Sequence, residues 1–411
     1  MTEKLFEMAL GISAPWFVAG TDFNAQARTL TIRVDFAPGS RFTVPGVDGE
    51  HPIHDTVAKR YRHLNFFQHE CFLEVRVPRV RLPDGAVRQI EPPWAGKLSG
   101  FTLLFEALVL MLCQQMTFAA AGRLVGESRH RVAAICERYV GLALAQADFS
   151  QVQELAIDET SRARGHDYIS LAADAVERRV LAVAEGRSVE TVETLAGELK
   201  QRGCVPEQVS SVSIDMSPAF IKGCIAQFAN ARITFDKFHV IWHASTAVDK
   251  MRRIEQRTER ALKGMRWSLL KDRSRLSPEA ATDLDALISR MTTVRTARAW
   301  LYKEQLREIL DRKQINVVRA MLQHWCTCVM RSKVEPMKEV AALVRNHLEG
   351  IVAWAQTRQT NGFLEALNGL FQAAKRRARG FTRMSTIRTV IFLIAGKLNF
   401  RVINPHAPQP T

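Results

Sequence analysis

Two short stretches of this chain, Leu155-Ala-Ile-Asp158 and Val212-Ser-Ile-Asp215, each end an apolar run with an aspartate. The apolar residues predict buried strands, and each aspartate then stands at the C-terminal end of its strand. A buried carboxylate is costly without a partner. If the two strands are neighbours, the two carboxylates converge and require a shared cation.

The segments around these stretches alternate between strand and helix patterns. Three sequential strands are expected first, then a helix capped by Ser188, a fourth strand, a helix opened by Ser217-Pro218 and a fifth strand. The order βββαβαβα is that of the RNase H-like fold, whose members cut or join phosphodiester bonds with metal ions held by carboxylates. We therefore expect an α/β protein with an RNase H-like, mixed five-stranded core. The strands are expected at residues 155–158, 168–173, 180–184, 209–215 and 233–236.

The rest of the chain has different patterns. The first part alternates apolar and polar residues between prolines, which predicts a small β-rich module. Residues 240–350 are helical in pattern and too many for a loop inside a compact domain, so they are interpreted as an all-α insertion. The expected domains are the β-rich N-terminal module (1–98), a helix-turn-helix domain (99–149), the catalytic domain (150–239 and 351–400), the helical insertion (240–350) and a tail (401–411).

The expected helix-turn-helix domain contains two short helical patterns separated by the tight turn Gly126-Glu127-Ser128. Residues 118–125 form the first helix, and the second begins at Arg129. This spacing is typical of a motif that presents the start of its second helix to the major groove of DNA. The residues at that position are Ser128, Arg129, His130 and Arg131. The residues expected to face inward are Val132, Ile135 and Cys136. An ordinary pair of antiparallel helices is the alternative.

Positive charge is concentrated in the second half of the chain. The 411 residues include 57 Lys+Arg and 42 Asp+Glu, which gives a net charge of +15. Residues 250–350 hold 22 basic and 12 acidic residues and residues 351–411 hold nine and one, whereas residues 1–249 hold 26 and 29. A segregated excess of this kind attracts phosphates, so we expect a polyanionic partner. A solvated basic surface is the alternative.

Glu365 is the one acid in residues 351–411 and lies near the start of an amphipathic helix that Asn361 can cap. Asn368 follows on the same polar stripe. The stripe leads to four basic residues that are expected to hold phosphates: Lys375, Arg376, Arg377 and Arg379. An isolated acid in so basic a segment suggests a metal ligand, so Glu365 is the candidate third carboxylate. The alternative is a glutamate favoured near a helix N-terminus by the helix dipole.

Composition excludes several classes of protein. With 47% hydrophobic and 24% charged residues, the chain is expected to fold. Seven cysteines scattered through apolar stretches favour reduced thiols without disulfides. The first ten residues lack the pattern of a signal peptide, and the longest apolar run, residues 101–113, is too short to span a membrane. A soluble, cytoplasmic protein without a membrane partner is expected.

Four motifs stand in order along residues 150–400. They are Ala156-Ile-Asp-Glu-Thr160, Ser213-Ile-Asp-Met-Ser-Pro-Ala-Phe220, Phe235-Asp-Lys-Phe-His-Val240, and Thr360-Asn-Gly-Phe-Leu-Glu365 with Asn368 and Lys375-Arg-Arg-Ala-Arg-Gly-Phe381. Together they resemble the ISL-three family of bacterial insertion-sequence transposases, a DDE group with an RNase H-like core. Residues 101–140 resemble the helix-turn-helix region of that family.

This resemblance implies a DNA transposase that binds the ends of its insertion sequence, cleaves the backbone and transfers the 3′-OH ends to target DNA. Asp158, Asp215 and Glu365 would take the catalytic, metal-binding roles in an in-line displacement with two Mg²⁺ or Mn²⁺ ions. The residues expected to support them are Asp236, His239, Asn361 and Asn368. The expected partner is double-stranded DNA, as terminal inverted repeats and as target, bound by a homodimer or larger assembly.

One departure from the family concerns the N-terminal module, which occupies the place of a zinc ribbon that binds DNA ends. Its paired cysteines are absent, and the histidines of residues 51–69 have no zinc-knuckle spacing, so no structural zinc is expected. Asp236 and His239 either orient the site or cap the next helix, and the cap is favoured. Two other functions stay open: an RNase H-like nuclease without strand transfer, and a catalytically inactive DNA-binding regulator derived from a transposase.

Overall fold

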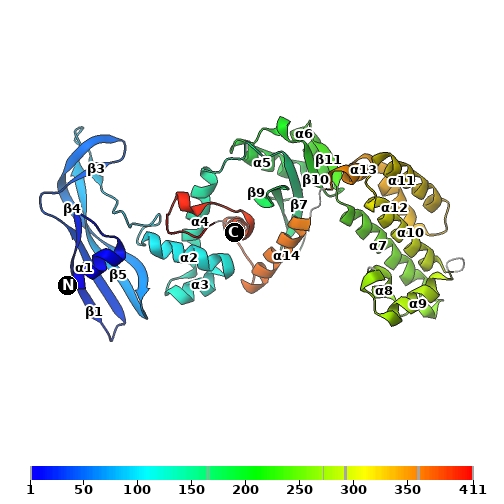
Figure 1. The fold of residues 1–411 in the computed structure, drawn as a ribbon, viewed down its shortest axis with the longest axis horizontal. Coiled ribbons are helices and arrows are strands. Elements are labelled where there is room, and N and C mark those ends of the chain that lie inside the picture. The colour runs from blue at the N-terminus through cyan, green and yellow to red at the C-terminus, as the bar shows by residue number, and fades with distance from the viewer. Residues whose placement is uncertain are drawn as a thin grey trace. The chain divides into compact units, whose positions relative to one another are not determined.

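The computed structural model describes residues 2–163, 165, 167–271, 273–290, 294–358 and 362–409. The chain divides into two compact units (Figure 1). The first contains residues 1–147 and 370–411, and the second contains residues 148–369. The division falls inside one helix, α14 (Gly362–Arg377). The domain limits expected from the sequence stay a prediction.

A six-stranded sheet forms the N-terminal part of the first unit, after helix α1 (Thr2–Leu10). Its strands are β1 (Trp16–Asn24), β2 (Thr29–Phe36), β3 (Arg41–Val44), β4 (Val47–Phe66), β5 (His69–Arg81) and β6 (Val87–Gln89). The order is β1-β2-β5-β4-β3 with β6 paired to β5, and β2 runs parallel to β5. Alternate residues of β2, namely Leu30, Ile32 and Val34, are buried in one core, as their alternation predicts.

Three helices follow this sheet: α2 (Leu103–Gln115), α3 (Phe118–Val125) and α4 (Arg129–Ala145). Gly126 ends α3 in the left-handed region, with a φ of 75°, a conformation that favours glycine. Ser128 begins α4, because its Oγ accepts a hydrogen bond from the Arg131 amide at 3.3 Å. The residues expected to face inward, Val132, Ile135 and Cys136, are fully buried. The predicted bounds of the first helix, the predicted start of the second helix and the predicted buried face are confirmed.

The buried guanidinium of Arg62, on β4, joins the sheet to the helix-turn-helix. It donates hydrogen bonds to the Cys71 carbonyl on β5 at 3.2 Å and to the Val125 carbonyl, the last of α3, at 3.1 Å. Next to that carbonyl, a Cβ built on Gly126 would lie 2.6 Å from a carboxylate oxygen of Glu70. The turn therefore rests directly on the sheet. At the other end of the chain, α15 (Met384–Ala395) and the 3₁₀ turn Phe400–Val402 complete this unit.

The second unit contains a five-stranded sheet in the order β11-β10-β7-β8-β9. Its strands are β7 (Glu154–Ala163), β8 (Asp167–Asp174), β9 (Arg179–Glu185), β10 (Ser211–Ile214) and β11 (Arg232–Phe235). Strands β7, β8 and β9 form an antiparallel meander, while β10 and β11 run parallel to β7. Helix α5 (Val189–Lys200) precedes β10, and α6 (Pro218–Gln227) follows it. The predicted element order and the predicted contact between the first and fourth strands are both confirmed.

Two details near the aspartates differ from expectation. Strand β7 does not end at Asp158 but continues to Ala163, because residues 158–163 stay paired with β8 in a hairpin. The pairing of β7 with β10, however, extends only to Ala156. Ser217 stands at the N-cap of α6 without a side-chain hydrogen bond to it; its backbone amide donates to Asp215 instead.

Between β11 and α14 the described residues form helices joined by turns and loops, with no strand among them, as predicted (Figure 1). The helices are α7 (Lys237–Glu255), α8 (Arg266–Leu270), α9 (Pro278–Ile288), α10 (Arg295–Asp311), α11 (Ile315–Met330), α12 (Glu335–Asn346) and α13 (Leu348–Thr357). Two 3₁₀ turns, Arg260–Leu262 and Arg273–Arg275, lie between them. A further 3₁₀ turn, Pro206–Gln208, precedes β10 in the sheet. Among the described residues, none of the helices combines the length and apolar character that crossing a bilayer requires. The seven cysteines are all free thiols, and six are buried.

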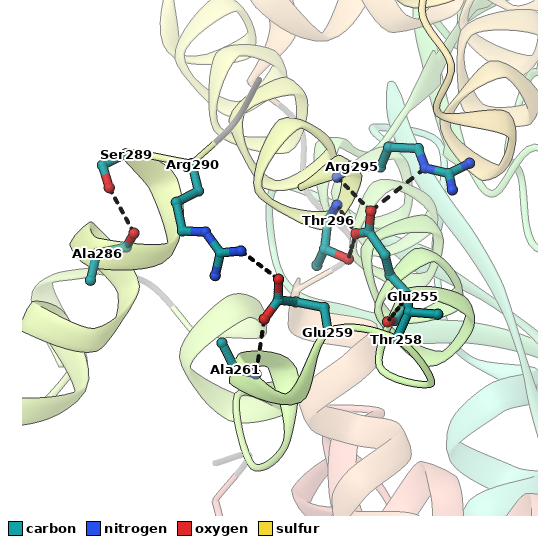
Figure 2. Close-up of polar contacts among 9 residues, drawn as sticks. All are labelled: Glu255, Thr258, Glu259, Ala261, Ala286, Ser289, Arg290, Arg295 and Thr296. Carbon is teal, nitrogen blue, oxygen red and sulfur yellow. Dashed lines mark hydrogen bonds and ion pairs between the residues drawn. The ribbon is translucent and has the colours of Figure 1, made fainter. Parts of the chain in front are cut away.

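Two acids of the insertion connect neighbouring segments through hydrogen bonds and an ion pair (Figure 2). Glu255, at the end of α7, accepts hydrogen bonds from the backbone amides of Arg295 and Thr296 at 2.8 and 2.7 Å, and so caps the start of α10. Glu259 accepts from the Ala261 amide and forms an ion pair with Arg290. Both carboxylates are thereby engaged by groups of the protein, and their side chains are 10% and 24% exposed.

A close approach at Gly122 gives the first test. A Cβ at this position of α3 would lie 2.5 Å from the Glu127 carbonyl, so Gly122→Ala must displace the turn, at a cost of about 1–3 kcal/mol. Amide hydrogen exchange of α3 and α4 in the full chain should accelerate about tenfold or more.

Gly141→Ala, at an exposed position of α4, is the matched control. Its Cβ would meet nothing within 4 Å, and alanine is the better helix former by roughly 1 kcal/mol. Exchange in α4 should therefore slow. Equal exchange rates in the two variants would contradict the close approach.

Candidate active site

The parallel pairing of three strands aligns three aspartates. Ser213 of β10 pairs with Ala156 of β7. Two residues later in the sequence come Asp215, directly after the end of β10, and Asp158, within β7. Ile214 of β10 likewise pairs with Phe235 of β11, one residue before Asp215 and Asp236. Because paired parallel strands keep their register, the three acids lie at the same level along the strands of the sheet.

Asp158 is the most enclosed of the three predicted acids, with 7% of its surface exposed. Its Oδ1 accepts from the Glu159 amide, and its Oδ2 accepts from Asn368 Nδ2, both at 2.9 Å. Burial raises the pKa of Asp158 to about 6. The charges of Asp215 and Glu365 also raise this pKa, so both of the other predicted acids act on Asp158.

Helix α14 supplies the third acid. Glu365 lies in its first turn and is exposed, and Asn368 follows one turn later. The hydrogen bond from Asn368 to Asp158 fixes α14 beside β7 (Figure 1). The two residues stand 210 positions apart in the sequence, yet the fold brings them together.

Glu159 is closer to this site than the sequence suggested. Strand alternation made it a weaker candidate, because neighbouring residues point to opposite faces. Burial and the charges of Asp215 and Asp158 nevertheless raise its pKa to about 7. Its Oε2 is buried without a hydrogen-bond partner among the described residues, and its Oε1 lies 3.9 Å from Arg187. The sequence signal for it was its position directly after Asp158.

Asp236 and His239 have different roles. Asp236 is fully buried, and its Oδ1 accepts from the Phe238 amide at 2.9 Å, which caps α7 as expected. His239 follows in the first turn of α7, and its charge lowers the pKa of both Asp158 and Glu159. Its Nε2 is buried and makes no hydrogen bond to a described residue. Asn361 lies outside the described residues.

The donor chemistry of this cluster suits a hard divalent cation. Carboxylate oxygens are the ligands that Mg²⁺ and Mn²⁺ prefer. Buried atoms of Glu159, His239 and Asn368 are without a partner in the described part of the chain, so polar capacity is left for a ligand. As the side chains stand, no three His, Cys, Asp or Glu residues among those described are arranged to hold a metal.

The residues expected to contact DNA lie on the first unit. Ser128, Arg129 and His130 are all exposed at the start of α4. Arg131 is also exposed but forms an ion pair with Glu127 at 2.8 Å and lies over the ring of Phe101. The four basic residues at and just beyond the end of α14 are the half-buried Lys375 and the exposed Arg376, Arg377 and Arg379.

Comparison with known families decides the relationship. A family model described as a transposase matches residues 155–391, more than half of the chain, and the model of the helix-turn-helix domain of transposase family ISL3 matches residues 90–140. The chain belongs to the ISL3 family of transposases. The first match includes the positions of Asp158, Asp215 and Glu365, and the second covers α2, α3 and most of α4.

Two relatives are similar to this protein over most of its length. The transposase for insertion sequence element IS1001 from Bordetella parapertussis is 26% identical over 340 residues, 80% of this chain and 82% of the relative. The transposase for insertion sequence element IS1557 from Mycobacterium tuberculosis is 26% identical over 368 residues, with 82% of each chain covered.

The raised pKa of Asp158 predicts how stability depends on pH when metal is removed. The folded-state pKa of about 6 exceeds the unfolded value of 3.8, so this group's stabilisation is present below pH 3.8 and lost as the pH rises through 6. Asp158→Asn should therefore stabilise the protein in EDTA at pH 8, by about 1–3 kcal/mol, and by about half as much at pH 5. The measurement is the thermal midpoint of each variant at both pH values.

Asp283→Asn, an exposed position on α9, is the control and should leave the midpoint unchanged. Added Mg²⁺ should raise the midpoint of the wild type more than that of Asp158→Asn, because a cation that binds the folded state stabilises it. If Asp158→Asn melted below the wild type at pH 8 in EDTA, burial of this charge would not be costly.

Proposed function

We propose that this ISL3-family protein is an active DDE transposase with an RNase H-like core. It binds the ends of its insertion sequence, cleaves their phosphodiester backbone and transfers the 3′-OH ends to target DNA. Relatives named as insertion-sequence transposases support the activity, and the strand order β11-β10-β7-β8-β9 supports the core. Residues 150–239 and 351–400 are the proposed catalytic domain.

Asp158, Asp215 and Glu365 are the proposed ligands of two divalent cations, Mg²⁺ or Mn²⁺. The observation that carries this assignment is the hydrogen bond from Asn368 to Asp158, because it holds the first turn of α14, and with it Glu365, near β7. When bound, such ions supply stabilisation of the negative charge that develops during in-line displacement at phosphorus.

Neighbouring groups orient these acids. The Asn368 amide fixes one oxygen of Asp158, and the Ser217 backbone amide donates to Oδ1 of Asp215 at 2.9 Å. The carboxylates keep lone pairs with which to bind a cation. His239 opposes the rise in the pKa of Asp158, so its positive form favours the ionised carboxylate that cation binding needs.

DNA recognition is assigned to the helix-turn-helix and to the basic end of α14. The start of α4 carries Arg129 and His130 on an exposed surface, where a major groove can be read. The basic residues that end α14 suit phosphates, which give affinity without sequence information. Because two ends must be joined to one target, we propose that a homodimer or larger assembly acts on DNA.

Cleavage and joining can be tested on DNA that carries both ends of the element. The wild type with Mg²⁺ should nick at the ends and join them to target DNA. Asp215→Asn and Glu365→Gln should each lower both reactions about a hundredfold or more, because each removes a charged ligand. The control is Glu335→Gln, an exposed glutamate in the first turn of α12, which should retain full activity.

Three outcomes separate the alternatives. Equal cleavage by Asp215→Asn and the wild type would remove the three-acid assignment. Cleavage without joined product would identify a nuclease. Specific binding of the ends by a wild type that never cleaves them would identify a DNA-binding regulator.

The assignment of α4 predicts a loss of sequence discrimination. Arg129→Ala should weaken binding to the element end about tenfold, since a side chain that contacts a base edge contributes about 1–3 kcal/mol of discrimination. Binding to a scrambled duplex should change less. Arg138→Ala, exposed further along α4, is the matched control. Fluorescence anisotropy gives both affinities. An equal loss of affinity for both duplexes would show that Arg129 contacts phosphate and not a base edge.

A further inference from the structure

The segment from the end of α7 through α8 carries an excess of positive charge. Residues 249–271 include eight basic residues and three acids, Asp249, Glu255 and Glu259. Figure 2 shows Glu255 and Glu259 engaged with the start of α10 and with Arg290. The remaining acid, Asp249, has a side chain that is only 10% exposed. Solvent therefore meets the basic side chains of this segment and little of its negative charge.

Asp249 gathers three arginines. Its Oδ1 lies 2.7 Å from Arg252 Nη2 and 3.8 Å from Arg266 Nε, and its Oδ2 lies 2.7 Å from Arg253 Nη2. Three guanidinium groups around one carboxylate leave net positive charge in a fixed arrangement. The side chains of Arg253 and Arg266 are 66% and 49% exposed, so both can reach a ligand. Their partial immobilisation lowers the entropy cost of binding an anion.

An exposed tryptophan stands beside these arginines. Trp267 is 61% exposed, although Met265 and Leu269, two residues away on either side, are buried. The Arg266 guanidinium lies 5.1 Å from the centre of the Trp267 ring. Helix α8 is itself anchored, because the fully buried Lys303 donates through Nζ to the Leu269 carbonyl at 2.7 Å. A large aromatic side chain is thus held toward solvent on a fixed support.

We propose that Arg253, Arg266 and Trp267 form a binding surface for single-stranded DNA. The arginines contact phosphates, and the open part of the indole stacks on an unpaired base. Bases inside a duplex offer no free face, which is why the occupant is single-stranded. The choice of DNA as the polyanion rests on the proposed function; the surface itself is separate from the three acids and from the helix-turn-helix.

The test measures the affinity of the full chain for two labelled probes in EDTA, where cleavage is suppressed. One probe is an oligothymidylate of about 20 nucleotides, and the other is a random duplex of about 20 base pairs. Both exceed the site size of a single-strand-binding groove. Trp267→Ala should weaken binding to the single strand about tenfold and leave duplex affinity within about twofold. Trp267→Phe should restore most of the loss. Arg253→Ala and Arg266→Ala should each reduce the salt dependence of single-strand affinity by about 0.7 in the logarithmic slope. Arg319→Ala, whose guanidinium pairs with Glu349 on another part of the insertion, is the matched control.

A second measurement guards against binding at other basic surfaces. A strand containing 5-iodouracil should photocrosslink to the peptide that carries Trp267. Unchanged single-strand affinity in Trp267→Ala, an equal loss on the duplex, or crosslinks confined to other segments would each overturn the proposal. Failure of the wild type to cleave element ends would overturn the proposed catalysis and leave this surface intact, so the two results are distinguishable.

Discussion

The parallel register between β7 and β10 is the constraint on which the candidate site depends. Pairing of Ala156 with Ser213 leads both strands to their aspartates at the same level. A slip of one residue would turn Asp215 to the other face of the sheet. Burial of the apolar residues before each aspartate fixes this register. The position of the two carboxylates therefore depends on the packing of apolar side chains.

The cost of this arrangement falls on Asp158. The fold encloses its carboxylate and surrounds it with other acids, which is unfavourable in the absence of a cation. The Asn368 amide and the Glu159 backbone amide offset part of that cost without neutralising the charge. The uncompensated negative charge lowers the stability of the folded protein at this position, and a bound cation would restore that stability.

Sequence patterns predicted the local features of this fold better than the contacts between distant segments. Gly126 and Ser128 fix the helix-turn-helix because turn and cap chemistry are local. The continuation of β7 to Ala163 was missed, since it depends on the hairpin with β8. Glu159 was undervalued for a similar reason: strand alternation gives the direction of a side chain, whereas its pKa reflects first its burial and then the charges of Asp215 and Asp158. The roles of the three acids themselves stay a prediction.

The buried Arg62 has a consequence for how DNA specificity could be exchanged among relatives. Its guanidinium reaches from β4 to the last carbonyl of α3, and the turn that follows lies against Glu70. A grafted helix-turn-helix that places no carbonyl at this position would cost the buried guanidinium one of its hydrogen bonds. A chimera joined at residue 99 would therefore cut through this contact, so the sheet and the three helices have to be exchanged together.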